Sequence, residues 1–120
     1  MHTVIYYEKP SGRRPVLEFI DGLETNAQAV ILEHFDTLRI QGHNLRRPDA
    51  DVVKGKIREL RTRFINNRFR TLYYFYHKDY IILLHAFQKK TSAVDPDDIE
   101  LAEKRMKDFE NRIMKGEIKL

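Results

Sequence analysis

The chain has 120 residues, 42% of them hydrophobic and 33% charged, which fits a single folded domain over residues 1–120 and excludes a disordered chain. It contains no run of about 18 apolar residues and no signal-peptide pattern, so the sequence predicts a cytoplasmic protein without membrane contact. The absence of cysteine excludes disulfides, thiol catalysis and thiolate metal sites.

The positive charge is concentrated in the middle of the chain. Residues 54–90 hold 10 Lys or Arg against 2 Asp or Glu, a net charge of +8, whereas residues 1–53 and 91–120 each have a net charge of −2. Such a block attracts polyanions, and contact with nucleic acid or the ribosome is favoured over a surface whose charge only maintains solubility.

The first third predicts a strand followed by two helices. Residues 2–8 are β-branched and aromatic, and Pro10–Gly12 is a turn signal. Pro15 suits the first position of one helix, Asn26 is a candidate cap of the next, and Gly42 a candidate stop. Apolar residues recur at helical spacing at Val16, Leu17, Phe19, Ile20 and Leu23, and again at Ala27, Ile31, Phe35 and Leu38.

The middle of the chain predicts a loop and then an antiparallel meander. Residues 43–55 have no clear period. A turn at Asn66-Asn67, which tolerate positive φ, and a two-residue turn at Lys78-Asp79 separate the strands. The strand-like runs are residues 56–62, 68–77 and 80–88.

The C-terminal segment predicts an amphipathic helix. Asp95 is its expected cap, Pro96 its first residue and Gly116 its end. Its apolar stripe is Ile99, Ala102, Met106, Phe109 and Ile113. The predicted fold class is therefore α+β, with the order β-α-α-β-β-β-α and helices packed on one covered face of the sheet.

Most enzyme signatures are missing from the sequence. There is no Gly-rich phosphate loop and no Gly-x-Ser-x-Gly elbow, which argues against most kinases, dehydrogenases and hydrolases. No metal-ligand spacing occurs among the histidines, which are His2, His34, His43, His77 and His85. We therefore expect neither a metal nor another cofactor.

Cations instead alternate along the predicted sheet. Period-two alternation places Arg61 on the face of Glu59, and Arg70 on the face of Arg68 in the next strand. His85, Phe87 and Lys89 share one face of the third strand in the same way, with Lys90 beyond them. Cations on adjacent strands repel each other unless an anion lies between them, so the pattern indicates a phosphate cradle.

Each of these residues also has a structural interpretation. Arg61 and Arg70 could pair with acids of the last helix, and Glu59 could be their local partner rather than an acid or base. His85 could be a hydrogen-bonded core histidine, and residues 89–90 a solvated strand end. Packing in the sheet is favoured over base stacking for the tyrosines, which are Tyr73, Tyr74 and Tyr76.

Three segments resemble the RelE/ParE toxin superfamily, and within it the phage-derived HigB-like branch. They are Gly55–Arg61 with Glu-Leu-Arg, Phe69–Tyr74 with aromatic-Arg-x-x-Tyr, and Leu83–Thr91 with His-x-Phe-x-Lys-Lys. Ala102 fits the Ala-containing final helix of that family. The resemblance covers residues 50–110 by motif and the N-terminal third by layout.

The resemblance implies the toxin of a type II toxin–antitoxin system. Such a toxin enters the ribosomal A site and cuts mRNA without a metal, by attack of the RNA 2′-OH on the neighbouring phosphate. It implies neutralisation by a cognate antitoxin, usually a helix-turn-helix protein. The alternatives are a ParE-like toxin that inhibits DNA gyrase without nuclease activity, and a basic RNA-binding module without toxicity.

The resemblance also assigns roles to residues. Arg70 is the expected phosphate stabiliser, with Arg61 assisting and Lys89 and Lys90 at the basic strand end. Glu59 and His85 are the candidate acid or base. The family's lysine pair in its second strand and its C-terminal catalytic tyrosine have no counterpart here. The expected RNA contacts are Lys54, Lys56, Arg58, Arg63, Arg68 and Tyr74.

Overall fold

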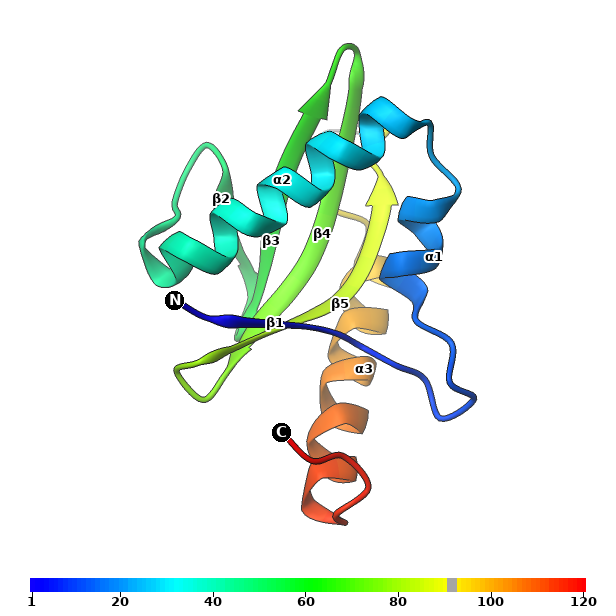
Figure 1. Cartoon of the computed structure of the whole chain (residues 1–120), viewed down its shortest axis with the longest axis vertical. Helices are drawn as coiled ribbons and strands as arrows, with labels where there is room; N and C mark the ends of the chain where they lie inside the picture. The colour runs from blue at the N-terminus through cyan, green and yellow to red at the C-terminus, as the bar shows by residue number, and fades with distance from the viewer. Residues whose placement is uncertain (91–92) are drawn as a thin grey trace.

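The computed structural model describes residues 1–90 and 93–120, so Thr91, the last residue of the third motif, lies outside the described part. Within these ranges the chain forms a five-stranded mixed sheet with helices on both faces (Figure 1). The elements are β1 (Thr3–Tyr6), α1 (Pro15–Asp21), α2 (Thr25–Gln41), η1 (Gly42–Asn44), β2 (Ala50–Lys54), β3 (Ile57–Phe64), β4 (Asn67–Tyr76), β5 (Tyr80–Gln88) and α3 (Pro96–Met114).

The strand order in the sheet is β1-β5-β4-β3-β2. β1 is parallel to β5, and every other neighbouring pair is antiparallel. The register between β4 and β5 shifts at Leu72, which pairs with His85, whereas Tyr73 pairs with Leu83. This bulge leaves Leu84 as an extra residue, and His85 therefore shares the sheet face of Leu72.

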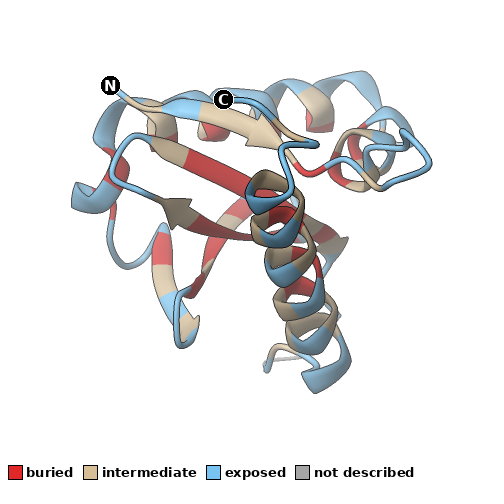
Figure 2. Cartoon of the chain, turned by 90° about the horizontal axis from the view of Figure 1, so that it is seen from below, coloured by how far each residue is buried: buried red, intermediate tan, exposed pale blue. Residues whose placement is uncertain are grey.

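Two hydrophobic cores lie on opposite faces of the sheet. The first is packed under α1 and α2, and α2 buries the four residues that its periodicity predicted: Ala27, Ile31, Phe35 and Leu38. The second lies under α3, which buries Ala102 and Phe109 against Leu72 and Tyr74. Figure 2 shows the buried residues gathered on the strands and on the helix faces that meet them.

The predicted fold class and the three-strand meander are confirmed, and the predicted bounds of β5 match the observed ones. Asp95 caps α3 as expected, since its side chain accepts a hydrogen bond from the backbone N–H of Asp97. Pro96 is in the first turn of α3. Its lack of a backbone N–H costs no hydrogen bond there, because the first N–H groups of a helix have no acceptor within the helix.

Four predictions about the fold were wrong. The segment 43–55 was expected to be a loop, but Ala50–Lys54 forms β2. This strand is stabilised by its hydrogen bonds to β3, so it forms without an alternating apolar pattern in its own sequence. The sheet is covered on both faces rather than one. Asn26 lies inside α2, whose N-cap is Glu24, and Ile65 rather than either asparagine takes the positive φ of the β3–β4 turn.

None of the helices in residues 1–90 and 93–120 is long and apolar enough to cross a bilayer.

Gly42 closes α2 in a conformation that other residues rarely adopt, with φ of 52° and ψ of −123°. A Cβ atom there would lie 2.0 Å from the His2 ring. We predict that Gly42→Ala lowers the free energy of unfolding by more than about 1 kcal/mol in urea denaturation. Gly55→Ala is the matched control, because Gly55 has φ of 55° but no atom within 4 Å of its added Cβ. Equal losses in both variants would contradict the steric part of this explanation.

Candidate nucleic-acid interface

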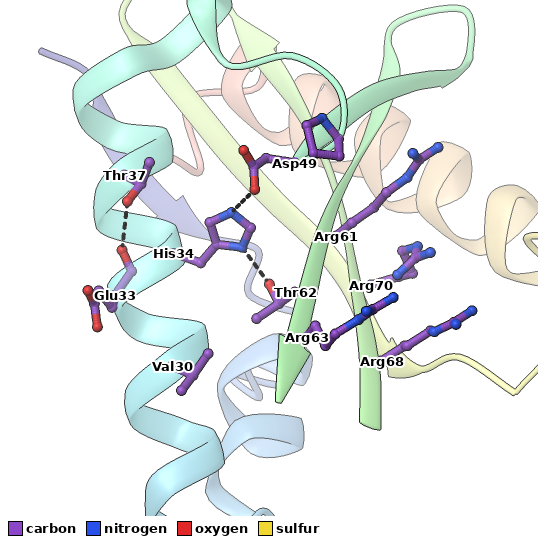
Figure 3. Close-up of a pocket in the computed structure, with 11 residues that line it drawn as sticks. Val30, Glu33, His34, Thr37, Asp49, Arg61, Thr62, Arg63, Arg68 and Arg70 are labelled. Carbon is purple, nitrogen blue, oxygen red and sulfur yellow. Dashed lines mark hydrogen bonds and ion pairs between the residues drawn. The ribbon is translucent and has the colours of Figure 1, made fainter. Parts of the chain in front are cut away.

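Four arginines project from one face of the sheet where β3 and β4 meet their connecting turn. Arg61 pairs with Arg70 and Arg63 pairs with Arg68 in the antiparallel register. Directly opposite side chains lie about 5 Å apart at Cβ, so these like charges repel each other. Figure 3 shows all four side chains extending away from α2.

Glu59 is the buried counter-ion of this group. One of its oxygens, Oε1, accepts a hydrogen bond from the Arg61 Nε at 2.8 Å and another from the Arg70 Nε at 2.9 Å. Glu59 is 5% exposed and Arg70 9% exposed. Arg61 also lies 3.6 Å from the Asp51 carboxylate. The alternative in which Glu59 is the local partner of these arginines agrees with the structure, whereas the alternative of pairing with acids of the last helix was wrong.

Lys89 adds a fifth cation immediately after β5. Its backbone N–H donates to the Arg68 carbonyl at 2.7 Å, which extends the β4–β5 ladder to the level of the arginines. The pKa of Lys89 is lowered by burial and then by the charge of Arg70, with Glu59 opposing the shift. Lys90 follows as an exposed residue. The group Glu59, Arg61, Arg63, Arg68, Arg70 and Lys89 is called the arginine face below.

His85 lies beside the arginine face and is tied to the start of α3. Its Nε2 is 2.7 Å from the Asp98 Oδ1, and its ring lies 5.1 Å from the Phe87 ring, centroid to centroid. Burial lowers the pKa of His85 more than Asp98 raises it, so the neutral ring is favoured. A neutral ring that donates Nε2–H to a carboxylate leaves the Nδ1 lone pair as its acceptor.

A groove of about 750 Å³ begins at the arginines and continues over the edge of β3 towards α2 (Figure 3). β2 pairs with β3 only as far as Leu60, so the rest of β3 is an edge that no strand of residues 1–90 and 93–120 covers. On the α2 side the groove is lined by Glu33, His34 and Thr37, with Asp49 from the loop before β2. The groove thus joins residues from both faces of the sheet.

The structure brings only some of the predicted RNA contacts to this site. Arg63 and Arg68 line the groove. Lys54 is paired with Glu103 of α3 at 3.3 Å, and Lys56 is exposed in the β2–β3 turn. Arg58 pairs in register with Tyr73, whose side chain faces the α1–α2 core.

Tyr74 does not offer a stacking surface. It is 1% exposed in the core under α3, and its hydroxyl donates to the Glu110 carboxylate at 3.4 Å. The interpretation of the tyrosines as packing residues therefore agrees with the structure, since Tyr73 is also fully buried.

His34 is a groove residue that the sequence did not reveal. Its Nδ1 is 2.8 Å from the Thr62 Oγ, and its Nε2 is 3.3 Å from the Asp49 Oδ1. Burial lowers the pKa of His34, so the neutral ring donates Nε2–H to Asp49 and accepts from the Thr62 hydroxyl. The three residues come from a helix, a loop and a strand, and no spacing in the sequence connects them.

Among the described residues, no group of three His, Asp or Glu side chains is arranged as a metal ion would require.

The family model described as Phage derived protein Gp49-like (DUF891) matches residues 18–107. The match begins within α1, ends within α3 and includes every residue of the arginine face and of the groove. A comparison with curated proteins gave no significant match.

The buried ion pairs of Glu59 generate a stability prediction. We expect Glu59→Ala to lower the free energy of unfolding by about 3 kcal/mol, because it leaves the buried Arg70 guanidinium without its counter-ion. The Glu59→Ala, Arg70→Ala double variant should lose less than the sum of the single variants in urea denaturation. Glu103→Ala is the control, since the exposed Lys54–Glu103 pair contributes at most about 1 kcal/mol. Additive losses for Glu59 and Arg70 would show that the pair is not coupled.

The partly buried His34 and His85 predict that acid weakens the fold. Burial lowers the pKa of His34 and His85 below 6.5, their unfolded value. Below pH 6.5 the unfolded chain therefore binds protons that the folded chain does not, and the free energy of unfolding falls as pH decreases from 7.5 to 5.5. Urea denaturation at those two pH values tests this, and a His34→Gln, His85→Gln variant should show a smaller decrease. A wild-type free energy that stays constant or rises would refute the assignment.

Proposed function

The chain belongs to the phage-derived Gp49-like family, a RelE-like and toxin-like family, and from this premise we propose that it is a HigB-like toxin that cuts mRNA on the ribosome. The observation that carries the proposal is the arginine face, where five cations lie on one face of the sheet and two of them, Arg61 and Arg70, bind one buried carboxylate. An RNA phosphate is the anion that fits this guanidinium cluster, because guanidinium donors match its oxygens.

Glu59 is proposed to position the arginines rather than to take up a proton. It binds Arg61 and Arg70 through their Nε atoms, and both arginines line the groove. Guanidinium groups fixed in this way need little reorganisation as negative charge builds up on phosphorus. Arg70 is the central stabiliser, and Arg63 and Arg68 hold the flanking backbone.

His85 and Lys89 are the proposed proton carriers. The 2′-OH proton moves to the His85 Nδ1 as the 2′-oxygen attacks phosphorus, and the P–O5′ bond breaks as the Lys89 ammonium protonates the leaving 5′-oxygen. The products are a 2′,3′-cyclic phosphate and a free 5′-OH. The lowered pKa values of both residues suit these roles, because a neutral imidazole accepts a proton and a destabilised ammonium releases one.

The partners follow from the open shape of the site. The groove supplies cations but few walls to orient an RNA strand, so the ribosome is proposed to hold the mRNA in line for attack. The cognate antitoxin is proposed to neutralise the toxin by covering the arginine face with acidic side chains. Both partners deliver anions to the same five cations, which makes their binding mutually exclusive.

Mapping of mRNA 5′ ends in a reconstituted translation reaction tests the proposal. We expect cuts that require ribosomes and that fall about 100-fold with Arg70→Ala. Arg68→Ala, at an exposed position, should lower cleavage without loss of stability. Arg13→Ala, which removes an exposed arginine outside the groove, is the matched control and should cut normally.

Two further measurements separate activity from folding. The urea midpoint of Arg70→Lys, which keeps the positive charge beside Glu59, reports whether lost cleavage reflects unfolding. Growth arrest by a folded wild-type protein without new mRNA ends, accompanied by a DNA-damage response, would refute nuclease activity and favour inhibition of gyrase.

A further inference from the structure

A second pocket, of about 410 Å³, lies between the loop that follows β1 and one side of α3. Of the described residues, none lines both this pocket and the groove beside the arginine face. The pocket combines apolar and basic side chains, which are Tyr7, Pro10 and Leu101, and Lys9, Lys104 and Arg105. It is called the α3 pocket below.

Arg105 is the buried cation of the α3 pocket. It is 9% exposed, and burial lowers the pKa of its guanidinium. Its Nη1 donates to the Leu84 carbonyl at 2.9 Å, and its guanidinium carbon lies 5.7 Å from the centroid of the Tyr7 ring. No carboxylate within residues 1–90 and 93–120 forms an ion pair with it. A guanidinium that is withdrawn from water without a counter-ion is unfavourable, so a bound anion stabilises it.

Asp108 lines the pocket but is engaged by other residues. Its Oδ2 accepts from the Tyr7 hydroxyl at 2.6 Å and from the Arg112 Nε at 3.0 Å. Arg105 has five N–H donors, and Leu84 accepts from one of them. The Arg105 Nε and Nη2 have no partner in the described part of the chain, and they are not among its unpartnered atoms that are shielded from solvent. These donors therefore reach solvent, through the pocket that Arg105 lines.

The lining favours one class of ligand. A carboxylate matches a guanidinium in a planar pair with two hydrogen bonds, and Lys9 and Lys104 add positive charge around it. An apolar group on the ligand gains free energy from contact with Leu101, because that contact removes apolar surface from water. A phosphate monoester brings up to two negative charges beside Asp108, so a carboxylate with its single charge is favoured.

We propose that the α3 pocket binds a ligand that joins one carboxylate to a compact apolar body. Arg105 pairs with the carboxylate, and the apolar body lies against Tyr7 and Leu101. A pocket of this size, with few polar groups, is typical of sites for small ligands. A free aromatic or aliphatic acid presents this chemistry, and so does the C-terminal residue of a peptide. The site is independent of the proposed function, because it shares no described lining residue with the groove.

An NMR titration of the isotope-labelled full chain tests the site. The probes are phenylacetate, its neutral isostere phenylacetamide, the peptide acetyl-Gly-Ser-Gly-Phe with a free C-terminus, and the same peptide with a C-terminal amide. We expect phenylacetate to shift the amide resonances of the pocket residues with a dissociation constant of about 1 mM. Phenylacetamide should bind about tenfold more weakly, because it forms no ion pair with Arg105.

Three variants assign the binding to the pocket. Arg105→Met keeps an apolar stem without the charge and should abolish the preference for phenylacetate over phenylacetamide. Lys104→Gln, at an exposed residue of the pocket, should weaken phenylacetate about threefold. Lys107→Gln makes the same charge change at an exposed position of α3 outside the pocket, and this matched control should bind as the wild type does. Where the spectrum of Arg105→Met shows an unfolded chain, the difference between Lys104→Gln and Lys107→Gln decides, and equal affinities overturn the proposal.

The remaining outcomes separate the class and the source of the ligand. Equal affinity of the wild type for phenylacetate and phenylacetamide, or an unchanged preference in a folded Arg105→Met, overturns the site. Tighter binding of inorganic phosphate than of phenylacetate overturns the carboxylate assignment. A preference for the free-acid peptide over its amide supports the site with a peptide C-terminus as ligand, and a preference confined to phenylacetate supports it with a free acid. None of these results depends on cleavage of mRNA, so the failure of either proposal leaves the other standing.

Discussion

The shared hydrogen bonding of Glu59 to two arginines is the interaction on which the site depends. Arg61 and Arg70 face each other across adjacent antiparallel strands, where uncompensated like charges would destabilise the sheet. The carboxylate between them accepts from both Nε atoms and is itself 5% exposed. The desolvation of three charged groups is offset only because they are held together in this geometry. One buried anion therefore allows the protein to keep five cations close together on this face, with Asp51 adding a second, longer contact to Arg61.

The bulge between β4 and β5 places His85 on the same face of the sheet as those cations. Without it, strict alternation from Leu83 would place His85 on the α1–α2 face of the sheet. The shift at Leu72 returns His85 to the face of Arg70 and next to Asp98 at the start of α3. The first turn of α3 thus supports the imidazole through Asp98. The packing of α3 and the chemistry of the site are therefore linked through one register shift.

Sequence periodicity was sufficient for much of this arrangement. Alternation within each strand placed Glu59 with Arg61, and Arg68 with Arg70, because a residue's face depends only on its own strand. Helical spacing in α2 identified all four of its buried residues for the same local reason. The edge strand β2 was missed because five residues with one exposed valine carry little pattern. Its existence depends on pairing with β3, and a pairing between strands is not visible in the pattern of residues 50–54 alone.

The parts of the site that could not be predicted are those that cross between elements. His34, Asp49 and Thr62 meet only after α2 packs on β3, and the free edge of β3 exists only because β2 stops at Leu60. Alternate side chains of β3 point to opposite faces of the sheet, with Arg61 and Arg63 on the arginine face and Thr62 on the side of α2. At the free edge of β3 side chains from both faces therefore line the same groove. A ligand that spans the edge therefore meets residues from both faces of the sheet within one groove.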